Sequence, residues 1–410
     1  MNAKALSKNP FNIIVIVASL GYFVDIYDLI LFGIVRVPSL IAIGIKQDQL
    51  LEKGIYLLNM QMIGMLLGGI LWGIMADKKG RLPVLFFTIA LYSLANIANG
   101  FVQNVEQYAI LRFFAGLGLA GELGIGITLV SEVMSKENRG YGTTMVSGIG
   151  IVGAVFGFLV ADVFDWRVAY WVGGGLGLLL LLLRVSVYES GMFEKIKSAP
   201  QTISRGNFLS IFTNRKRFLK YLYCILLGVP SWFVVGILVI QAPEFGKVLG
   251  IQGEIIGGKA VMWQYVGLSI GSFLTGFLSQ WLRSRKKSLF IALVFLIIFT
   301  IWYFSAYGSS AFVFYLIITL LGVAQGYWAV FITTASEQFG TNLRATVTTT
   351  VPNFVRGATI PITLSVLFLK DKFDLWTAGV IVGTVCIGIA VMAVFLIEET
   401  FDKDLDYIEE

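Results

Sequence analysis

The sequence contains twelve apolar runs, each long enough to cross the hydrocarbon core of a membrane as a helix. Such a core is about 30 Å thick, so a spanning helix needs about 20 predominantly apolar residues. The composition agrees, because 57% of the residues are hydrophobic and 14% are charged, whereas soluble domains are about a quarter charged. The sequence therefore predicts an all-α membrane protein with twelve transmembrane helices, at residues 12–34, 54–76, 83–103, 107–133, 140–163, 167–187, 219–242, 257–280, 287–306, 311–336, 343–369 and 375–397.

One long polar segment divides the runs into two groups of six. Residues 188–218 carry six Lys and Arg residues and few apolar ones, which is typical of a cytoplasmic linker with a surface helix. Sequence features also recur on both sides of it, since Glu337 and Arg344 follow Glu132 and Arg139 at an offset of 205 residues. We therefore expect two pseudo-symmetric six-helix bundles, at residues 1–187 and 219–410.

The positive charges predict the orientation in the membrane. With both termini in the cytoplasm, 21 of the 31 Lys and Arg residues fall in inner segments and 8 in outer ones, as the positive-inside rule requires. The net charge of +6 then reflects topology, and no nucleic-acid partner is expected. The first run is too long for a signal-peptide core and no cleavage site follows it, so we expect it to be retained. Compact loops favour a bacterial inner (plasma) membrane.

A short polar hairpin joins the second and third runs. Residues 73–81 fit the pattern G-x-x-x-D-K-x-G-R, in which Gly80 suits a left-handed turn. This pattern resembles the signature loop between helices two and three of the major facilitator superfamily of transporters. The resemblance spans essentially the whole chain and implies a monomer with its solute site at mid-membrane, between the halves. The corresponding loop of the second half has lost the acid, because Ser279 and Gln280 stand near the place of Asp77.

The sequence offers no residue set for catalysis. It has no histidine, and it contains no H-E-x-x-H, G-x-S-x-G or phosphate-cradling G-K-S motif. We therefore expect neither an enzyme nor an intrinsic ATPase, and no metal or cofactor. Without an imidazole, any proton chemistry must use carboxylates.

Two carboxylates in the first run are candidates for that chemistry. Asp25 and Asp28 are three residues apart and hence on one face of a helix. Ionisable groups at this depth are costly, and two such close carboxylates would repel if both were ionised, so at least one should bind a proton. The fourth run adds Arg112 and, about 15 Å further along the helix, Glu122. Either aspartate could instead pair with a basic neighbour, and the sequence leaves open which of the three acids binds the proton.

Two more segments resemble particular branches of the superfamily. The R-x-x-x-G-x-G segment from Arg112 resembles its fourth-helix signature, and Tyr27-Asp28 resembles the tyrosine-aspartate pair of sugar–proton symporters. That resemblance implies Asp28 as the proton site and Arg112 as its counter-ion. The D-x-x-D of the first run with G-E-x-G around Glu122 resembles metabolite–proton symporters, including sialic acid and lactate carriers. The expected function is proton-coupled symport of a small organic solute, a carboxylate, by alternating access. A proton-coupled exporter of drugs or metabolites is the alternative.

A second buried cation lies in the eleventh run. The planar fork of Arg356 suits a carboxylate, so we expect it to bind an anionic substrate, helped by Asn353. Organic-anion carriers of the superfamily also place a cation in this helix. The alternative is a salt bridge from Arg356 to Asp25 or Glu122. Polar and aromatic residues at helical depth would complete the substrate site, and these are Gln61, Gln241, Gln264, Tyr27, Tyr327 and Trp328.

Charged residues at the inner helix ends are expected to act as gates. Asp77 could meet the positive N-terminal end of the eleventh helix and favour an outward-open state. The other gating candidates would form ion pairs that break as the halves rock, and these are Arg81, Glu132, Arg139, Glu337 and Arg344.

Overall fold

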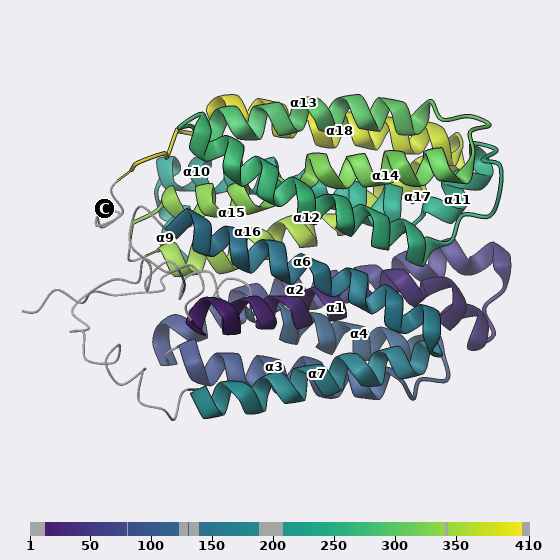
Figure 1. Cartoon of the computed structure of the whole chain (residues 1–410), viewed down its shortest axis with the longest axis horizontal. Helices are drawn as coiled ribbons and strands as arrows, with labels where there is room; N and C mark the ends of the chain where they lie inside the picture. Colours follow the sequence, from purple (N-terminus) through teal and green to yellow (C-terminus); the bar gives the residue numbers. More distant parts are fainter. Residues whose placement is uncertain are drawn as a thin grey trace, which may run out of the picture.

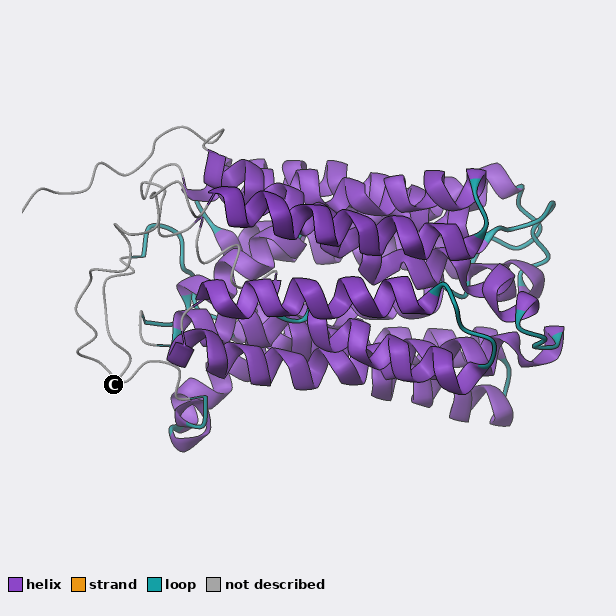
Figure 2. Ribbon diagram, turned by 90° about the horizontal axis from the view of Figure 1, so that it is seen from below, coloured by secondary structure: helices purple, strands orange, loops and turns teal. Residues whose placement is uncertain are grey.

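The computed structural model describes residues 13–79, 81–122, 130, 139–187, 208–340 and 343–403. In these residues all regular structure is helical, apart from one isolated bridge between Gln252 and Ser310. The N-terminal helices, purple to blue-teal in Figure 1, lie beside the C-terminal helices, which run from teal through green to yellow. A view from a second side shows helices running along one common long axis (Figure 2).

The N-terminal half is a group of mutually packed long helices. Helix α1 packs against α6 and α7, α2 against α4, and α3 against α4 and α7. Its elements are α1 (Ile13–Ala42), the short η1 (Gln47–Gln49), α2 (Leu50–Lys79), α3 (Arg81–Asn99), α4 (Val105–Leu119), α6 (Arg139–Val163) and α7 (Trp166–Val187).

The C-terminal half repeats this architecture with more interruptions. Pro230 lies inside α10, which passes directly into the π-helical turn η3; a proline removes one backbone donor from a helix. The elements are α9 (Ser210–Thr213), α10 (Arg215–Phe233), η3 (Val234–Val239), α11 (Ala242–Val248), α12 (Gly257–Trp281), α13 (Arg285–Phe304), α14 (Ala311–Gln325), α15 (Trp328–Glu337), α16 (Arg344–Gly357), α17 (Thr359–Lys372) and α18 (Leu375–Leu396).

The predicted all-α architecture is confirmed, since each of the twelve predicted runs overlaps a described helix. Ten described stretches are long and apolar enough to cross a membrane, and Pro83–Asn99 is a shorter apolar helix. The predicted run 107–133 is described as α4 up to Leu119 and then continues partly outside the described residues. Helix α10 begins at Arg215, inside the segment predicted as a linker.

Two of the predicted long helices are broken in the membrane interior. Gly326 separates α14 from α15, and Ala358 separates α16 from α17. Gly326 lies so close to the backbone of Gly271 in α12 that a side chain would not fit there. In the other half, α4 ends and the chain turns at Gly121. Interrupted helices are tolerated at membrane depth where protein buries them or a cavity adjoins them.

The same close contact between helix backbones occurs in both halves. A Cβ on Gly116 of α4 would clash with the carbonyl of Gln61 in α2, and one on Gly322 of α14 would clash with the carbonyl of Gln264 in α12. Small residues let membrane helices approach this closely. The two glutamines are 203 residues apart in the sequence, close to the predicted repeat offset.

The halves meet along four main helix pairs. Helix α6 packs on α12, where the Ser269 hydroxyl donates to the Gly148 carbonyl at 3.2 Å, and α1 also packs on α12. Helix α2 packs on α16 and α17, and the Thr363 hydroxyl donates to Oδ1 of Asn59 at 2.9 Å. The interface therefore carries polar contacts as well as apolar packing.

Candidate functional site

Besides Arg36, which lies toward the C-terminal end of α1, six charged side chains of the described residues are buried in the two bundles with an exposed fraction of 5% or less. A charged group is costly at membrane depth, so such residues are functional candidates. Five belong to the N-terminal half and one to the C-terminal half; they are Asp25, Asp28, Arg112, Glu122, Arg184 and Arg356.

Asp28 is enclosed by α7. Its Oδ1 lies against the backbone of Gly173, where an added Cβ would clash with it. Within the described part of the chain, neither carboxylate oxygen has a partner in hydrogen-bonding geometry, although the Asn96 side chain of α3 is close enough to act on it. The neighbouring Tyr27 hydroxyl donates to the Ala169 carbonyl of α7 at 2.8 Å, so this predicted substrate ligand is engaged in helix packing.

Arg112 lies near Asp28, and its charge acts on that carboxylate. Among the described residues, however, its hydrogen bond goes to Oε1 of Gln61, whose amide donates in turn to the Leu29 carbonyl at 3.1 Å. The guanidinium carbon also lies 5.3 Å from the ring centre of Phe32 and 5.9 Å from that of Tyr170. Arg112 is thus held by an amide and two rings, at a short distance from an unpartnered acid.

Glu122 pairs with Arg184 of α7, and both side chains are almost fully buried, with exposed fractions of 2% and 3%. The sequence did not predict this partner, because Arg184 stands in no recognised motif. Its position inside the apolar run 167–187 was the signal that could have identified it. The sequence left open a salt bridge between Arg356 and Glu122 as one alternative, but in the structure the cation that pairs with Glu122 is Arg184.

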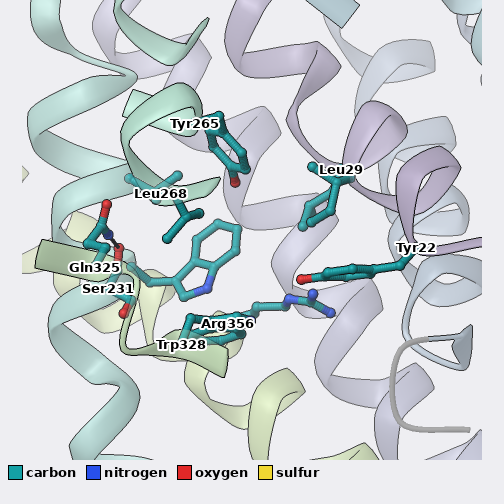
Figure 3. Close-up of a pocket in the computed structure, with 11 residues that line it drawn as sticks. Tyr22, Leu29, Ser231, Tyr265, Leu268, Gln325, Trp328 and Arg356 are labelled. Atoms are coloured by element: carbon teal, nitrogen blue, oxygen red, sulfur yellow. Dashed lines mark hydrogen bonds between the residues drawn. The ribbon is translucent and has the colours of Figure 1, made fainter. Parts of the chain in front are cut away.

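Arg356 adjoins a small cavity between the halves. The cavity has a volume of about 30 Å³ and is lined by residues of α1, α10, α12, α14, α15 and α16, among them Tyr22, Ser231, Trp328 and Arg356. Figure 3 shows the Tyr22 hydroxyl directed toward the guanidinium of Arg356. Ligand sites for small molecules are about 300 Å³ or larger, so this conformation has no room there for an organic solute. Tyr22 and Tyr265, which both line the cavity, were not predicted.

Asn353 connects Arg356 with the other half. Its Oδ1 accepts from Nη1 of Arg356 at 3.2 Å, and its amide nitrogen donates to the Ala120 and Thr349 carbonyls, each at 2.8 Å. Ala120 is the C-terminal cap of α4. The Ala120 carbonyl at the end of α4 therefore accepts its hydrogen bond from Asn353 of the C-terminal half.

The predicted amides of the C-terminal half form their own network. Nε2 of Gln264 donates to Oε1 of Gln325 at 2.5 Å, and Nε2 of Gln325 donates to the Ser231 carbonyl at 2.7 Å. The Tyr327 hydroxyl accepts from the Ser231 hydroxyl at 3.0 Å. Gln241 is buried beyond η3, and neither atom of its amide group has a hydrogen-bond partner among the described residues. Of the predicted ligands, the structure brings Arg356 and Trp328 to the cavity itself.

The gating candidates are described in the C-terminal half. Glu337 pairs with Arg285 at 3.2 Å and accepts from the Thr400 hydroxyl at 2.8 Å. Nε of Arg344 donates to the Ser336 carbonyl at 3.2 Å. Four candidates cannot be placed in this way, because Glu132 lies outside the described residues, as do the side chains of Asp77, Arg81 and Arg139.

Glu399 adds a contact to the same end of the C-terminal half. It accepts from the backbone N–H of Arg285 at 2.9 Å and from the Ser284 hydroxyl. Partial burial raises the pKa of Glu399, but hydrogen bonds from Ser284 and three backbone N–H groups outweigh it and hold the pKa below its ordinary value. The loop that lacks an equivalent of Asp77 is therefore bound by Glu337 and Glu399, acids from elsewhere in its own half.

At the opposite end of the bundle, an ion pair joins the two halves. Arg36 of α1 lies 2.8 Å from Glu244 of α11 and also donates to the Ile240 carbonyl at 3.1 Å. The pair borders a cavity of about 1040 Å³ between the helix ends. Neither residue was predicted, because the two are 208 residues apart and neither stands in a recognisable motif.

Comparisons with known proteins agree with this architecture. The chain is 25% identical to a putative niacin/nicotinamide transporter of Bacillus subtilis, over 90% of this chain and 93% of that protein. It is 27% identical to a sialic acid transporter of Escherichia coli, over 75% of each chain. An inward-open structure of the E. coli xylose transporter has the same fold, with a TM-score of 0.71 at 17% identity over 97% of this chain and 98% of that one.

The family profile of the major facilitator superfamily matches residues 13–357. The relatives compared are metabolite transporters, and Asp25, Asp28 and Arg356 lie on helices that meet between the two six-helix halves. The chain therefore belongs to the major facilitator superfamily and is a membrane-embedded transporter of small organic solutes, not an enzyme.

Proposed function

We propose that this transporter is a proton-coupled symporter that carries a small organic carboxylate by alternating access. The N-terminal bundle (1–187) and the C-terminal bundle (219–410) move about the interface, joined by the linker at 188–218. The protein acts as a monomer in a bacterial inner membrane, with both termini in the cytoplasm. Its partners are the solute, protons and the bilayer.

The observation that carries this proposal is the burial of Asp28 without a hydrogen-bond partner in the described residues. Removing an ionised carboxylate from water costs several kcal/mol unless it is paired, and the group then takes up a proton instead. In the conformation described above, Asp28 is therefore protonated and neutral. When it loses the proton, its charge attracts Arg112, which must leave Gln61 to form the pair.

The substrate side of the proposal rests on Arg356. It is buried, it adjoins the cavity between the halves, and its guanidinium points to the Tyr22 hydroxyl (Figure 3). An arginine in this setting can bind a carboxylate through two parallel hydrogen bonds. The names of the relatives support this class of solute, since one is described as carrying cis,cis-muconate and another sialic acid. Trp328 would wall the expanded site.

Gating would use contacts at the two ends of the bundle. The Arg36–Glu244 pair holds the halves together at the end that we assign to the outside, and it must break for outward opening. At the inner end, Asp77, Arg81, Glu132, Arg139, Glu337 and Arg344 would hold the closed arrangement. Each state is favoured by the ligand that binds it better, which links proton binding to solute binding.

Purified protein in liposomes with a pH-sensitive dye in the lumen tests this function. A panel of small carboxylates, their neutral amides and a few sugars is added outside, with protein-free liposomes to correct for passive entry of weak acids. A symporter acidifies the lumen when its carboxylate enters, whereas an exporter that exchanges solute for protons makes the lumen alkaline. Solute entry without any proton signal would refute the coupling.

A further inference from the structure

The ion pair between Glu122 and Arg184 is buried in the interior of the N-terminal half. Arg184 stands near the end of α7, and Glu122 follows the turn that ends α4. The backbone of α1 covers both side chains at Gly21, where an added Cβ would clash with Nη2 of Arg184 and Oε1 of Glu122. Because residue 21 is a glycine, the pair lies directly against the backbone of the helix that carries the two aspartates.

The ionisable groups around this pair come from two elements: Asp25 on α1 and Tyr92 on α3. Asp25 in turn adjoins Asp28 on α1 and Arg356 on α16. The charges of both Glu122 and Arg184 act on Asp25. In the described part of the chain, Oδ1 of Asp25 and both oxygens of Asp28 have no hydrogen-bond partner. The three buried acids thus differ, because Glu122 has a cation in contact and the aspartates do not.

We propose that Arg184 is a positioning residue that keeps Glu122 ionised throughout the transport cycle. Proton binding is thereby left to Asp25 and Asp28. This inference rests on the proposed symport, and it assigns different roles to acids that the sequence could not separate. The physical reason is that a buried carboxylate in contact with a buried guanidinium is stable as the anion, whereas an uncompensated one is stable as the neutral acid.

The pair also explains why the proton sites lie on α1. A fixed negative charge at Glu122 disfavours ionisation of Asp25 beside it, and the positive charge of Arg184 limits that effect. The opposite arrangement would have Glu122 as a carrier that releases Arg184 each time it binds a proton. The two arrangements predict different proton-to-substrate ratios when either residue is changed.

The test measures that ratio in liposomes for wild type, Arg184→Gln, Glu122→Gln and the double variant, with Arg184→Lys as the control that keeps the charge. Removing Arg184 leaves Glu122 uncompensated, so it should bind a proton from one side of the membrane and release it to the other in each cycle, which raises the ratio by one proton per solute. The double variant and Arg184→Lys should return to the wild-type ratio. Glu122→Gln alone should keep the wild-type ratio, at a lower transport rate.

Infrared difference spectroscopy on purified protein gives a second readout that does not need transport. Neutral carboxylic acids absorb separately from carboxylates, so a protonated Glu122 appears as an extra band that Glu122→Gln removes. At neutral pH, wild type and Glu122→Gln should show the same neutral-acid bands, because Glu122 is ionised in wild type. Arg184→Gln, if it folds, should show one additional neutral-acid band.

A proton-to-substrate ratio that falls by one in Glu122→Gln, or a neutral-acid band lost from wild type in that variant, would overturn the role given to Arg184. The absence of an added neutral-acid band in folded Arg184→Gln would do the same. If wild type moves solute without protons, symport itself fails, and the infrared bands still decide whether Glu122 is charged.

Discussion

The two halves of this transporter use the same helix contact to hold different chemistry. In the N-terminal half, Gly116 lets α4 approach the Gln61 carbonyl, and the Gln61 side chain accepts from Arg112. In the C-terminal half, Gly322 lets α14 approach the Gln264 carbonyl, and the Gln264 side chain donates to another amide, Gln325. A charged group thus stands in one half where a neutral one stands in the other.

Under the proposed symport, this difference assigns proton coupling to one half and solute recognition to the other. The described interior of the N-terminal half holds acids and cations close together, as proton coupling requires, whereas that of the C-terminal half holds an amide network and Arg356 beside the cavity. A proton site needs a charge that appears and disappears, while a solute site needs fixed donors and acceptors. We therefore expect changes in the two halves to affect coupling and recognition separately.

Replacement of Asp28 by Asn should have the largest effect. The amide mimics the neutral acid and cannot release a proton, so solute-driven proton movement should fall by about a hundredfold or more, which corresponds to about 2.7 kcal/mol. Solute binding, followed by tryptophan fluorescence, should change only a few-fold, because Arg356 is intact. If binding falls as far as proton movement does, the separation between the halves is lost.

Replacement of Arg356 should come next, and it should affect recognition. Truncating one partner of a buried charge pair costs about 2 to 5 kcal/mol, so Arg356→Ala should weaken carboxylate binding by about 30-fold or more. Arg356→Lys keeps the charge but loses the planar fork and should give an intermediate value. Calorimetry with the carboxylate and its neutral amide is the measurement. Equal losses for both ligands would make Arg356 a structural residue.

The matched pair Gln61→Ala and Gln264→Ala compares the halves most directly. Hydrogen bonds to a charged group contribute about 1.5 to 3 kcal/mol and neutral ones about 1 kcal/mol. Gln61→Ala should therefore destabilise the protein more and should slow proton-coupled transport, because it removes the acceptor of Arg112. Thermal unfolding in detergent measures the first effect and the liposome assay the second. Similar losses in both variants would argue against the difference in chemistry.

The smallest effect is expected at Glu399. Its pKa lies below the ordinary value of 4.5, so its carboxylate stabilises the fold above that value, and this contribution disappears as the pH falls through the lowered pKa. Because the group is partly exposed, the contribution should stay below about 1 kcal/mol. Glu399→Gln should unfold slightly earlier than wild type at neutral pH and at the same temperature in acid. A difference that grows in acid would contradict this sign.

The fold could be predicted from the sequence because it depends on local patterns. Each apolar run is visible by itself, and lipid leaves few alternatives to a helix for such a run. The breaks in the membrane interior were less visible, since Gly326 interrupts its helix through a contact with Gly271, which is distant in the sequence. A glycine in an apolar run has no signature that distinguishes a break from ordinary close packing.

The candidate site could be predicted only in part, for the same reason. Asp25 and Asp28 could be identified from their spacing on one helix, and Arg356 could be identified because it is an isolated charge in an apolar run. Contacts such as Glu122–Arg184 and Arg36–Glu244 depend on how helices distant in sequence pack, so no spacing predicts them. The roles of Asn353 and Tyr327 were also hidden, because their side chains bond to backbone carbonyls of other segments.

The backbone contacts at Gly116 and Gly322 have a consequence for how this protein can diversify. A methyl group at either position would meet a carbonyl that belongs to a helix backbone and has little freedom to move. In a library of random variants these sites should therefore tolerate almost nothing, while cavity residues such as Tyr22, Tyr265 and Trp328 should accept many replacements. New solute preferences can then arise without disturbing the scaffold, which suits a carrier whose relatives are named for niacin, muconate and sialic acid.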